Sequence, residues 1–252
     1  MAVVLEGGCR VSMMHEGEPR VSGSLRIWNQ IGKASGAKAI SLRVLELGPG
    51  TSPVLSNRES DEVFYLLDGR CTVVIGEDEY DVEPETGVYL RPGQTLRVKN
   101  NGAEVVQFIS SQCPEEADET ESLDQPVKSG GELPPIVKLS DRRALPTADR
   151  WYRVLVDDEI GSEQVTQFVG SIPPGRAPDH FHEYEEVLFI LRGEGRMWAG
   201  ETNTPIGPGS CIYLPRGQVH CVENTGSGEL RLLGVFYPAG SPAVRYESAQ
   251  NL

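Results

Sequence analysis

GRAPDHFHEYEEVLFILRG, at residues 175–193, joins two histidines, a glutamate and a run of apolar residues between two glycines. His180 and His182 are two positions apart, so on an extended chain both side chains point to the same face, with Cα atoms roughly 6.6 Å apart. Both imidazoles can therefore reach one ion. Glu186 stands at the start of the apolar run, where a carboxylate on the next strand would reach the same ion.

A second stretch, GSCIYLPRGQVHCVEN at residues 209–224, contains one more of the chain's four histidines, His220. His220 follows the turn residues Pro215-Arg216-Gly217, which would direct the next strand inward. Because neutral imidazoles and a carboxylate suit Fe, Mn, Co, Ni, Cu or Zn, we predict one divalent transition metal ion per chain. The predicted ligands are His180, His182, Glu186 and His220. We favour this over four unrelated polar residues because the two histidine contexts occur together.

The chain is an internal duplication. A shift of 124 residues places the first half on the second without a gap, so that Pro49 falls on Pro173 and Gly69 on Gly193. Glycine and proline require particular backbone angles, and shared turn residues therefore predict one fold for both halves.

Within each half the pattern predicts strands. In the second half, five segments are rich in β-branched, aromatic and aliphatic residues, and glycine or proline separates most of them. These segments are Gln164–Ser171, Glu186–Leu191, Gly195–Ala199, Ser210–Leu214 and Leu230–Tyr237. No long segment has helical periodicity with caps. Many short strands with frequent turns predict an all-β antiparallel sandwich or barrel.

Residues 114–135 are acidic, with prolines and the pair Gly130-Gly131. This composition cannot bury apolar area and indicates a linker. We therefore predict an N-terminal barrel at residues 1–113 and a C-terminal barrel, with the metal site, at residues 136–252.

The overall charge excludes some partners. The 252 residues carry a formal net charge of −14, which repels phosphate backbones and anionic headgroups, so we expect no nucleic acid and no membrane partner.

No apolar run approaches the ~18 residues of a spanning helix, and the start MAVVLEGGCR lacks the basic region of a signal peptide. Five cysteines without a C-x-x-C pair indicate reduced, mostly buried thiols in a cytoplasmic protein.

The two histidine stretches together resemble the paired motifs of the cupin superfamily. The second matches G-x5-P-x-G-x2-H-x3-N throughout, while the first has four residues after its leading glycine where five are usual. With two units the chain resembles a bicupin. The resemblance implies two tandem double-stranded β-helix (jelly-roll) barrels, with the metal inside the barrel that carries His180, His182, Glu186 and His220.

The first half departs from this pattern. Ser56, Arg58, Glu62 and Leu96 stand at the positions of the four ligands, and only the carboxylate remains. Leu96 cannot bind a metal and Arg58 is a permanent cation, so we expect this barrel to fold without metal. We favour an ion pair between Arg58 and Glu62; the alternative is a pocket in which Arg58 binds an anion.

Other residues near the motifs are weaker candidates. Arg176, Arg196 and Arg216 could each hold a substrate carboxylate through paired hydrogen bonds, although most such arginines are simply solvated. Tyr213 adjoins the second motif, but Tyr89 occupies its place in the half without ligands, so a packing role is favoured. One of Met197 and Trp198 should line the barrel, because adjacent strand residues face opposite sides.

For function, we expect a metal-dependent enzyme that acts on a small organic molecule. The best-populated version of such an enzyme is an iron oxygenase, such as a dioxygenase, with substrate and dioxygen at two open positions of the ion. The alternatives are a non-redox isomerase, decarboxylase or hydrolase, or a binding or regulatory protein without turnover. Oxalate-decarboxylase-like bicupins carry the ligand set in both halves and so fit poorly. The barrels should associate within the chain, which makes a monomer or a homodimer possible.

Overall fold

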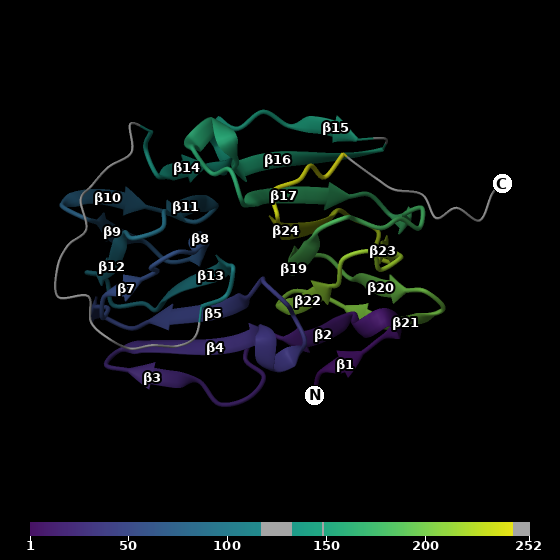
Figure 1. Ribbon diagram of the computed structural model, residues 1–252, viewed down its shortest axis with the longest axis horizontal. Coiled ribbons are helices and arrows are strands. Elements are labelled where there is room, and N and C mark those ends of the chain that lie inside the picture. Colours follow the sequence, from purple (N-terminus) through teal and green to yellow (C-terminus); the bar gives the residue numbers. More distant parts are fainter. Residues whose placement is uncertain (117–132, 148, 244–252) are drawn as a thin grey trace.

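The computed structural model describes residues 1–116, 133–147 and 149–243. Two barrels of antiparallel strands lie side by side (Figure 1), and each has the two facing sheets of a jelly roll. The predicted all-β fold is therefore confirmed. Of the predicted linker, residues 117–132 lie outside the described part of the chain.

The first barrel consists of a seven-stranded and a five-stranded sheet. The seven-stranded sheet contains, in spatial order, β14 (Ile136–Lys138), β11 (Thr86–Leu90), β8 (Asp61–Asp68), β13 (Val106–Cys113), β5 (Leu42–Leu47), β4 (Leu25–Ile31) and β3 (Arg20–Ser22). The five-stranded sheet contains β10 (Asp78–Val82), β9 (Cys71–Ile75), β12 (Thr95–Asn100), β6 (Gly50–Thr51) and β7 (Leu55–Ser56).

The second barrel repeats this plan with an eight-stranded and a four-stranded sheet. The larger sheet contains β1 (Val3–Val4), β2 (Arg10–Met13), β22 (Ser210–Leu214), β19 (Glu185–Arg192), β24 (Leu230–Tyr237), β17 (Thr166–Ile172), β16 (Arg150–Val156) and β15 (Leu145–Thr147). The smaller sheet contains β18 (Gly175–Arg176), β23 (His220–Asn224), β20 (Gly195–Ala199) and β21 (Thr202–Ile206). The five strands predicted in this half correspond to β17, β19, β20, β22 and β24.

Helical structure in the described residues is limited to short 3-10 turns: η1 (Glu6–Gly8), η2 (Lys33–Ser35), η3 (Leu139–Asp141) and η4 (Asp158–Ile160). None of the described helices is long and apolar enough to span a membrane.

The two barrels exchange edge strands. Near the N-terminus, β2 pairs with β22 of the second barrel, with Val11 opposite Ile212, and β14 pairs with β11 of the first barrel, with Val137 opposite Gly87. In Figure 1 the purple β2 accordingly lies in the half of the molecule that contains the green β22. The predicted divisions at residues 1–113 and 136–252 follow the order of the chain. In the structure, β2 comes from the first range and lies in the second barrel, whereas β14 comes from the second range and lies in the first barrel.

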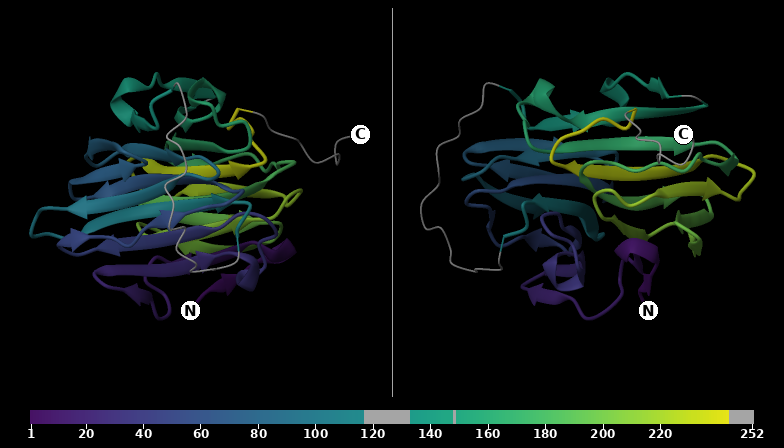
Figure 2. Two further views of the ribbon diagram at one scale, coloured as in Figure 1. Left: turned by 60° about the vertical axis from the view of Figure 1, so that its left-hand side comes forward. Right: turned by 45° about the vertical axis from the view of Figure 1, so that its right-hand side comes forward.

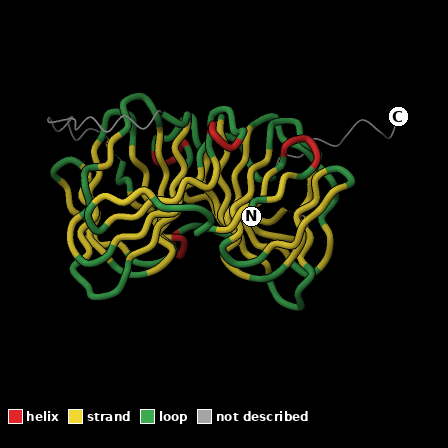
Figure 3. Tube along the Cα trace, turned by 90° about the horizontal axis from the view of Figure 1, so that it is seen from below, coloured by secondary structure: helices red, strands yellow, loops and turns green. Residues whose placement is uncertain are grey.

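The central strands of the larger sheets have two buried faces. On β19, Leu188 and Ile190 belong to the core inside the second barrel, while Val187 and Phe189 belong to a core shared by the two barrels. The equivalent strand β8 contributes Tyr65 to the same shared core. Burial of both faces explains why these strands are apolar runs without alternation. The barrels therefore meet through the faces of their larger sheets. Figure 2 shows the two barrels in two turned views, and Figure 3 shows them side by side from below.

Candidate metal centre

Backbone pairing brings two of the predicted ligands together. His180 forms an isolated antiparallel bridge with His220, the first residue of β23; the amide of His180 donates to the carbonyl of His220 at 3.0 Å, and the reverse bond is 2.8 Å long. The carbonyl of His182 accepts the amide of Gly217 at 2.8 Å. Gly217 has φ of +76°, which glycine adopts without strain, so the turn before His220 can approach the loop that carries the other two histidines.

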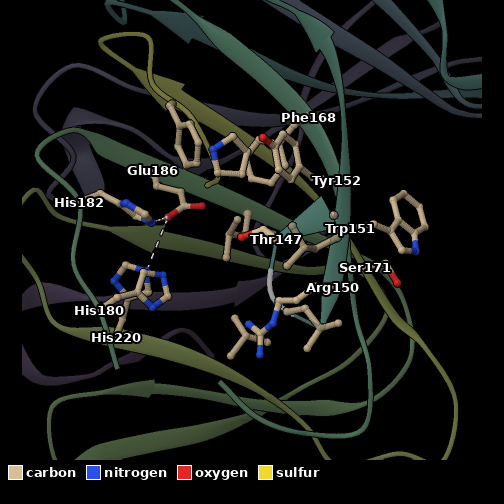
Figure 4. A pocket seen from close by; sticks show the side chains of 17 residues that line it. Thr147, Arg150, Trp151, Tyr152, Phe168, Ser171, His180, His182, Glu186 and His220 are labelled. Carbon is tan, nitrogen blue, oxygen red and sulfur yellow. Dashed lines mark ion pairs between the residues drawn. The ribbon is translucent and has the colours of Figure 1, made fainter. Parts of the chain in front are cut away.

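The three imidazoles and the carboxylate converge. His180, His182 and His220 each offer a nitrogen, and these atoms lie within 4.8 Å of one another. Glu186, on β19, places Oε2 at 3.7 Å from Nε2 of both His182 and His220 (Figure 4). The four residues predicted from the sequence therefore gather at one point inside the second barrel.

Hydrogen bonds orient the rings. Nδ1 of His220 lies 2.8 Å from the carbonyl oxygen of Gln218, and Nδ1 of His180 lies 3.1 Å from that of Pro178. A proton on Nδ1 that is donated to a carbonyl fixes the tautomer and leaves Nε2 with its lone pair. Both rings therefore present Nε2 as the atom that can bind a cation.

The electrostatics of this cluster suit a cation. Burial raises the pKa of Glu186 to about 8, and its Oε2 accepts no hydrogen bond among the described residues. Burial, followed by the neighbouring His180, lowers the pKa of His220 well below its usual range, so the ring is neutral. A buried carboxylate oxygen that accepts no hydrogen bond is costly, and a divalent ion beside it would offset that cost. Three neutral imidazoles and one carboxylate fit Fe, Mn, Co, Ni, Cu or Zn.

The cluster lies at one wall of a small pocket of about 90 Å³. That volume equals roughly six water-sized probes, so the pocket accommodates a ligand of a few heavy atoms. Apart from the cluster, its walls are mainly aromatic and aliphatic side chains. They include Tyr152, Phe168, Leu188, Val222, Leu232, Phe236 and Pro242.

The pocket contains an arginine that the sequence analysis did not select. Arg150, the first residue of β16, lies across the pocket from the histidines, with a side chain that is 11% exposed (Figure 4). Its Nε lies 3.1 Å from Asp149. The only feature of the sequence that marked Arg150 was its match to Arg26 in the first half. Arg26 is exposed on β4, so this match did not indicate a binding role.

The three arginines that the sequence did single out do not line this pocket. Arg176 donates to Asp179 and lies over the Trp198 ring, 4.1 Å from its centroid. Arg196 donates to Asn203 at 2.6 Å, and Arg216 donates to Glu183 at 3.0 Å, in exposed pairs. These positions agree with the favoured interpretation that such arginines are solvated, and carboxylate binding by them in this pocket finds no support.

The structure decides two further expectations about side chains near the motifs. Met197 is fully buried in the core of the second barrel, whereas Trp198 is partly exposed, so Met197 is the residue that lines the barrel. Tyr213 is buried in the core between the barrels and donates its hydroxyl hydrogen to Glu185. The packing role favoured for Tyr213 is confirmed.

In the first barrel, Glu62 is 1% exposed but is saturated with hydrogen bonds. It accepts from Arg43, from the hydroxyl of Ser110 and, at 2.9 Å, from the amide of Asn57. Leu96 is buried in the barrel core, and Arg58 is exposed. The predicted ion pair between Arg58 and Glu62 is wrong, because a guanidinium from β5, and not one from the loop, reaches the buried carboxylate.

Comparison with known proteins places the chain in a family. Residues 43–111 and again 168–236 match the family described as "Cupin domain". Auxin-binding protein 1 of Arabidopsis thaliana is 32% identical over an alignment of 86 residues, and the match covers 30% of this chain and 43% of that protein. The oxalate-binding protein of Thermotoga maritima is 38% identical over 67 residues, which are 26% of this chain and 55% of that protein. The chain thus spans about half the length of these curated relatives.

Solved structures with the same fold include proteins with two barrels. A mutant of oxalate decarboxylase OxdC from Bacillus subtilis superimposes with a TM-score of 0.74 at 14% identity, covering 92% of this chain and 78% of that one. Protein Ylba from E. coli gives 0.75 at 14% identity, with 94% and 93% covered. At these identities the likeness shows the fold alone. The two matches to the cupin domain cover more than half of the residues, and the chain therefore belongs to the cupin family, with two cupin domains in tandem.

Proposed function

We propose that the second barrel binds one divalent transition metal ion through His180, His182, Glu186 and His220. The convergence of the three histidines with a buried carboxylate oxygen that accepts no hydrogen bond among the described residues carries this proposal. When bound, such an ion acts as a Lewis acid that binds and polarises substrate oxygens.

We further propose that the ligand of this pocket is a small carboxylic acid. Arg150 faces the metal ligands from the opposite wall, and a guanidinium binds a carboxylate through two parallel hydrogen bonds. The mainly apolar walls lower the local dielectric constant, which strengthens that interaction. The name of the Thermotoga relative, an oxalate-binding protein, supports the same class of ligand.

The reaction we favour is a non-redox cleavage of this acid. Among such reactions we place decarboxylation ahead of the others. The same fold carries an oxalate decarboxylase in Bacillus subtilis. The sequence pattern alone argued against a decarboxylase, because decarboxylase-like bicupins carry metal ligands in both halves. A decarboxylase with this sequence would therefore work with one metal centre. The iron-dioxygenase expectation has weaker support, since the oxalate-binding relative and the oxalate decarboxylase of this fold favour decarboxylation instead.

A second candidate is a metal-assisted binding protein without turnover. Besides the four ligands, the polar side chains that line the pocket are Thr147, Arg150, Trp151, Tyr152 and Ser171. Among the described lining residues there is thus no further carboxylate or imidazole to act as a general acid or base, which favours this candidate.

One experiment distinguishes the candidates. Metal-loaded and metal-stripped protein are each titrated with oxalate by calorimetry, and carbon dioxide and formate are then measured in the same samples. Metal-dependent binding with formate production supports the decarboxylase. Metal-dependent binding without any product supports the binding protein, and equal oxalate binding with and without metal contradicts both.

A further inference from the structure

The residues after β24 form a wall between two cavities. Pro242 and Tyr152 line both the metal pocket and an outer cavity of about 430 Å³. The outer cavity is also lined by Ala239, Gly240 and Ser241. We call Ala239–Pro242 the wall segment; it lies where the two cavities adjoin.

Tyr184 attaches the wall segment to the loop that carries His180 and His182. Its side chain is buried, and its hydroxyl donates to the carbonyl of Ser241 at 3.1 Å. A second bond, from the amide of Gly240 to the hydroxyl of Thr166 at 3.2 Å, joins the wall segment to β17. These two bonds hold the wall segment across the barrel.

The ring of Tyr184 also contacts a predicted metal ligand. It stacks on His182 with centroids 4.8 Å apart and an interplanar angle of 12°. Phe236 lies 4.4 Å from the Tyr184 ring and 5.5 Å from the His182 ring. A methyl group at Gly240 would come within 2.3 Å of the Tyr184 ring, so the wall segment touches the ring directly. The ring therefore has little room to move, and it restricts the plane of the imidazole.

The first barrel shows which part of this arrangement belongs to the fold. Ser60 occupies the position of Tyr184, and its hydroxyl donates to the carbonyl of Pro114 at 2.6 Å, in the segment after the last strand. In both barrels this position thus donates a hydrogen bond to a carbonyl of the segment after the last strand, although the two acceptors are not equivalent residues. The aromatic ring is present where the histidines are, and is absent where Arg58 replaces His182.

We propose that Tyr184 is a positioning and specificity-determining residue with two separable roles. The ring holds His182 in the orientation that binds the metal, and the hydroxyl holds the wall segment closed, so that the pocket admits only small acids. This inference rests on the proposed metal site and adds to it a residue that controls both metal affinity and ligand size.

The test separates the two roles with Tyr184→Phe and Tyr184→Leu. Cobalt(II) affinity is measured by competition with a chelator together with the absorption spectrum of the bound ion, and the binding of oxalate and of the larger phthalate is measured by calorimetry. Tyr184→Phe should keep the cobalt affinity and spectrum but gain phthalate binding. Tyr184→Leu should lose roughly tenfold or more in cobalt affinity, the range seen when a partner of a metal ligand is removed, with a changed spectrum.

Tyr80→Leu serves as the matched control, because Tyr80 is a partly buried tyrosine of the first barrel and should leave every measurement unchanged. If Tyr184→Leu does not fold, Gly240→Ala replaces it. Its methyl group would come within 2.3 Å of the Tyr184 ring, so the ring or the wall segment must shift, and displacement of the ring should lower cobalt affinity. Wild-type protein that binds no cobalt would refute the metal site itself. Wild-type binding with an unchanged affinity and spectrum in Tyr184→Leu refutes the positioning role, and exclusion of phthalate by Tyr184→Phe refutes the size role.

Discussion

Glu62 and Glu186 occupy the same position in the two barrels and have opposite surroundings. Glu62 receives hydrogen bonds from Arg43, Ser110 and Asn57, whereas Oε2 of Glu186 accepts none among the described residues and lies near two imidazoles. A carboxylate inside a barrel needs a positive partner. The first barrel supplies that partner as a guanidinium, and the second leaves the place for an ion from solution.

In the first barrel, Arg43→Met should destabilise the protein by about 3–5 kcal/mol, because it leaves Glu62 buried without its cation. The metal content should remain that of the wild type. Urea denaturation measures the free energy of unfolding, and elemental analysis measures the metal. Lys99→Met is the control: it breaks an exposed pair with Glu79 and should cost no more than about 1 kcal/mol. Equal losses in the two variants would contradict the role assigned to Arg43.

In the second barrel, Arg150→Ala should weaken oxalate binding by roughly tenfold to a hundredfold, the loss expected for charge-assisted hydrogen bonds of about 1.5–3 kcal/mol. Metal content should not change, since Arg150 lies across the pocket from the ligands. Calorimetric titration of the metal-loaded protein measures the affinity. Arg216→Ala, at an exposed pair with Glu183, should bind oxalate like the wild type. Wild-type affinity in Arg150→Ala would exclude a carboxylate site at this wall.

The metal-free protein should lose stability as pH rises from about 6.5 to 8. Burial raises the pKa of Glu186 to about 8 in the folded state, so in this range the unfolded chain is ionised and the folded protein holds an extra proton. Stability is then present at low pH and falls by about 1.4 kcal/mol per pH unit. The depressed pKa of His220 acts in the opposite direction, but only below its unfolded value near 6.5.

Denaturation of metal-stripped protein at several pH values measures this slope, and Glu186→Gln should remove it. The same linkage predicts that metal binding at pH 7 releases a proton, which calorimetry in buffers of different ionisation enthalpy detects. A slope that survives in Glu186→Gln would assign the pH dependence to another group.

The exchanged strand at the N-terminus predicts that the second barrel cannot be separated from the first residues of the chain. Deletion of residues 2–13 removes β2 from β22 and takes Leu5, Cys9 and Val11 out of the core of the second barrel. The loss of several buried side chains, each worth about 1.5–3 kcal/mol, should unfold that barrel and abolish metal binding. Circular dichroism and elemental analysis check this. A folded, metal-binding variant without these residues would contradict the exchange.

The sequence predicted the repeated fold and the cluster because both depend on local signals. Turn glycines such as Gly69 and Gly193 impose φ near +85°, and the spacing of His180 and His182 places them on one face. The sequence did not show that β2 joins the second barrel, because short strands carry no information about a partner some 200 positions away.

The remaining errors concern side chains whose partners come from distant strands. Arg43 reaches Glu62 from β5, which is separated from β8 by β13, while Arg58, which is closer in sequence, is exposed. Arg150 enters the pocket from the first residue of β16, far from either histidine stretch. Proximity to a motif in the chain was therefore a poor guide to which arginine lines the pocket, since register and sheet order decide it.

The most direct measurement is elemental analysis of protein purified without chelators, for the wild type, His182→Ala and Arg58→Ala. The account predicts about one transition metal ion per wild-type chain, nearly none in His182→Ala, and an unchanged content in Arg58→Ala, which alters the equivalent position of the first barrel. A wild-type protein that retains no metal after incubation with iron, manganese, nickel, cobalt, copper or zinc would contradict it, as would two ions per chain.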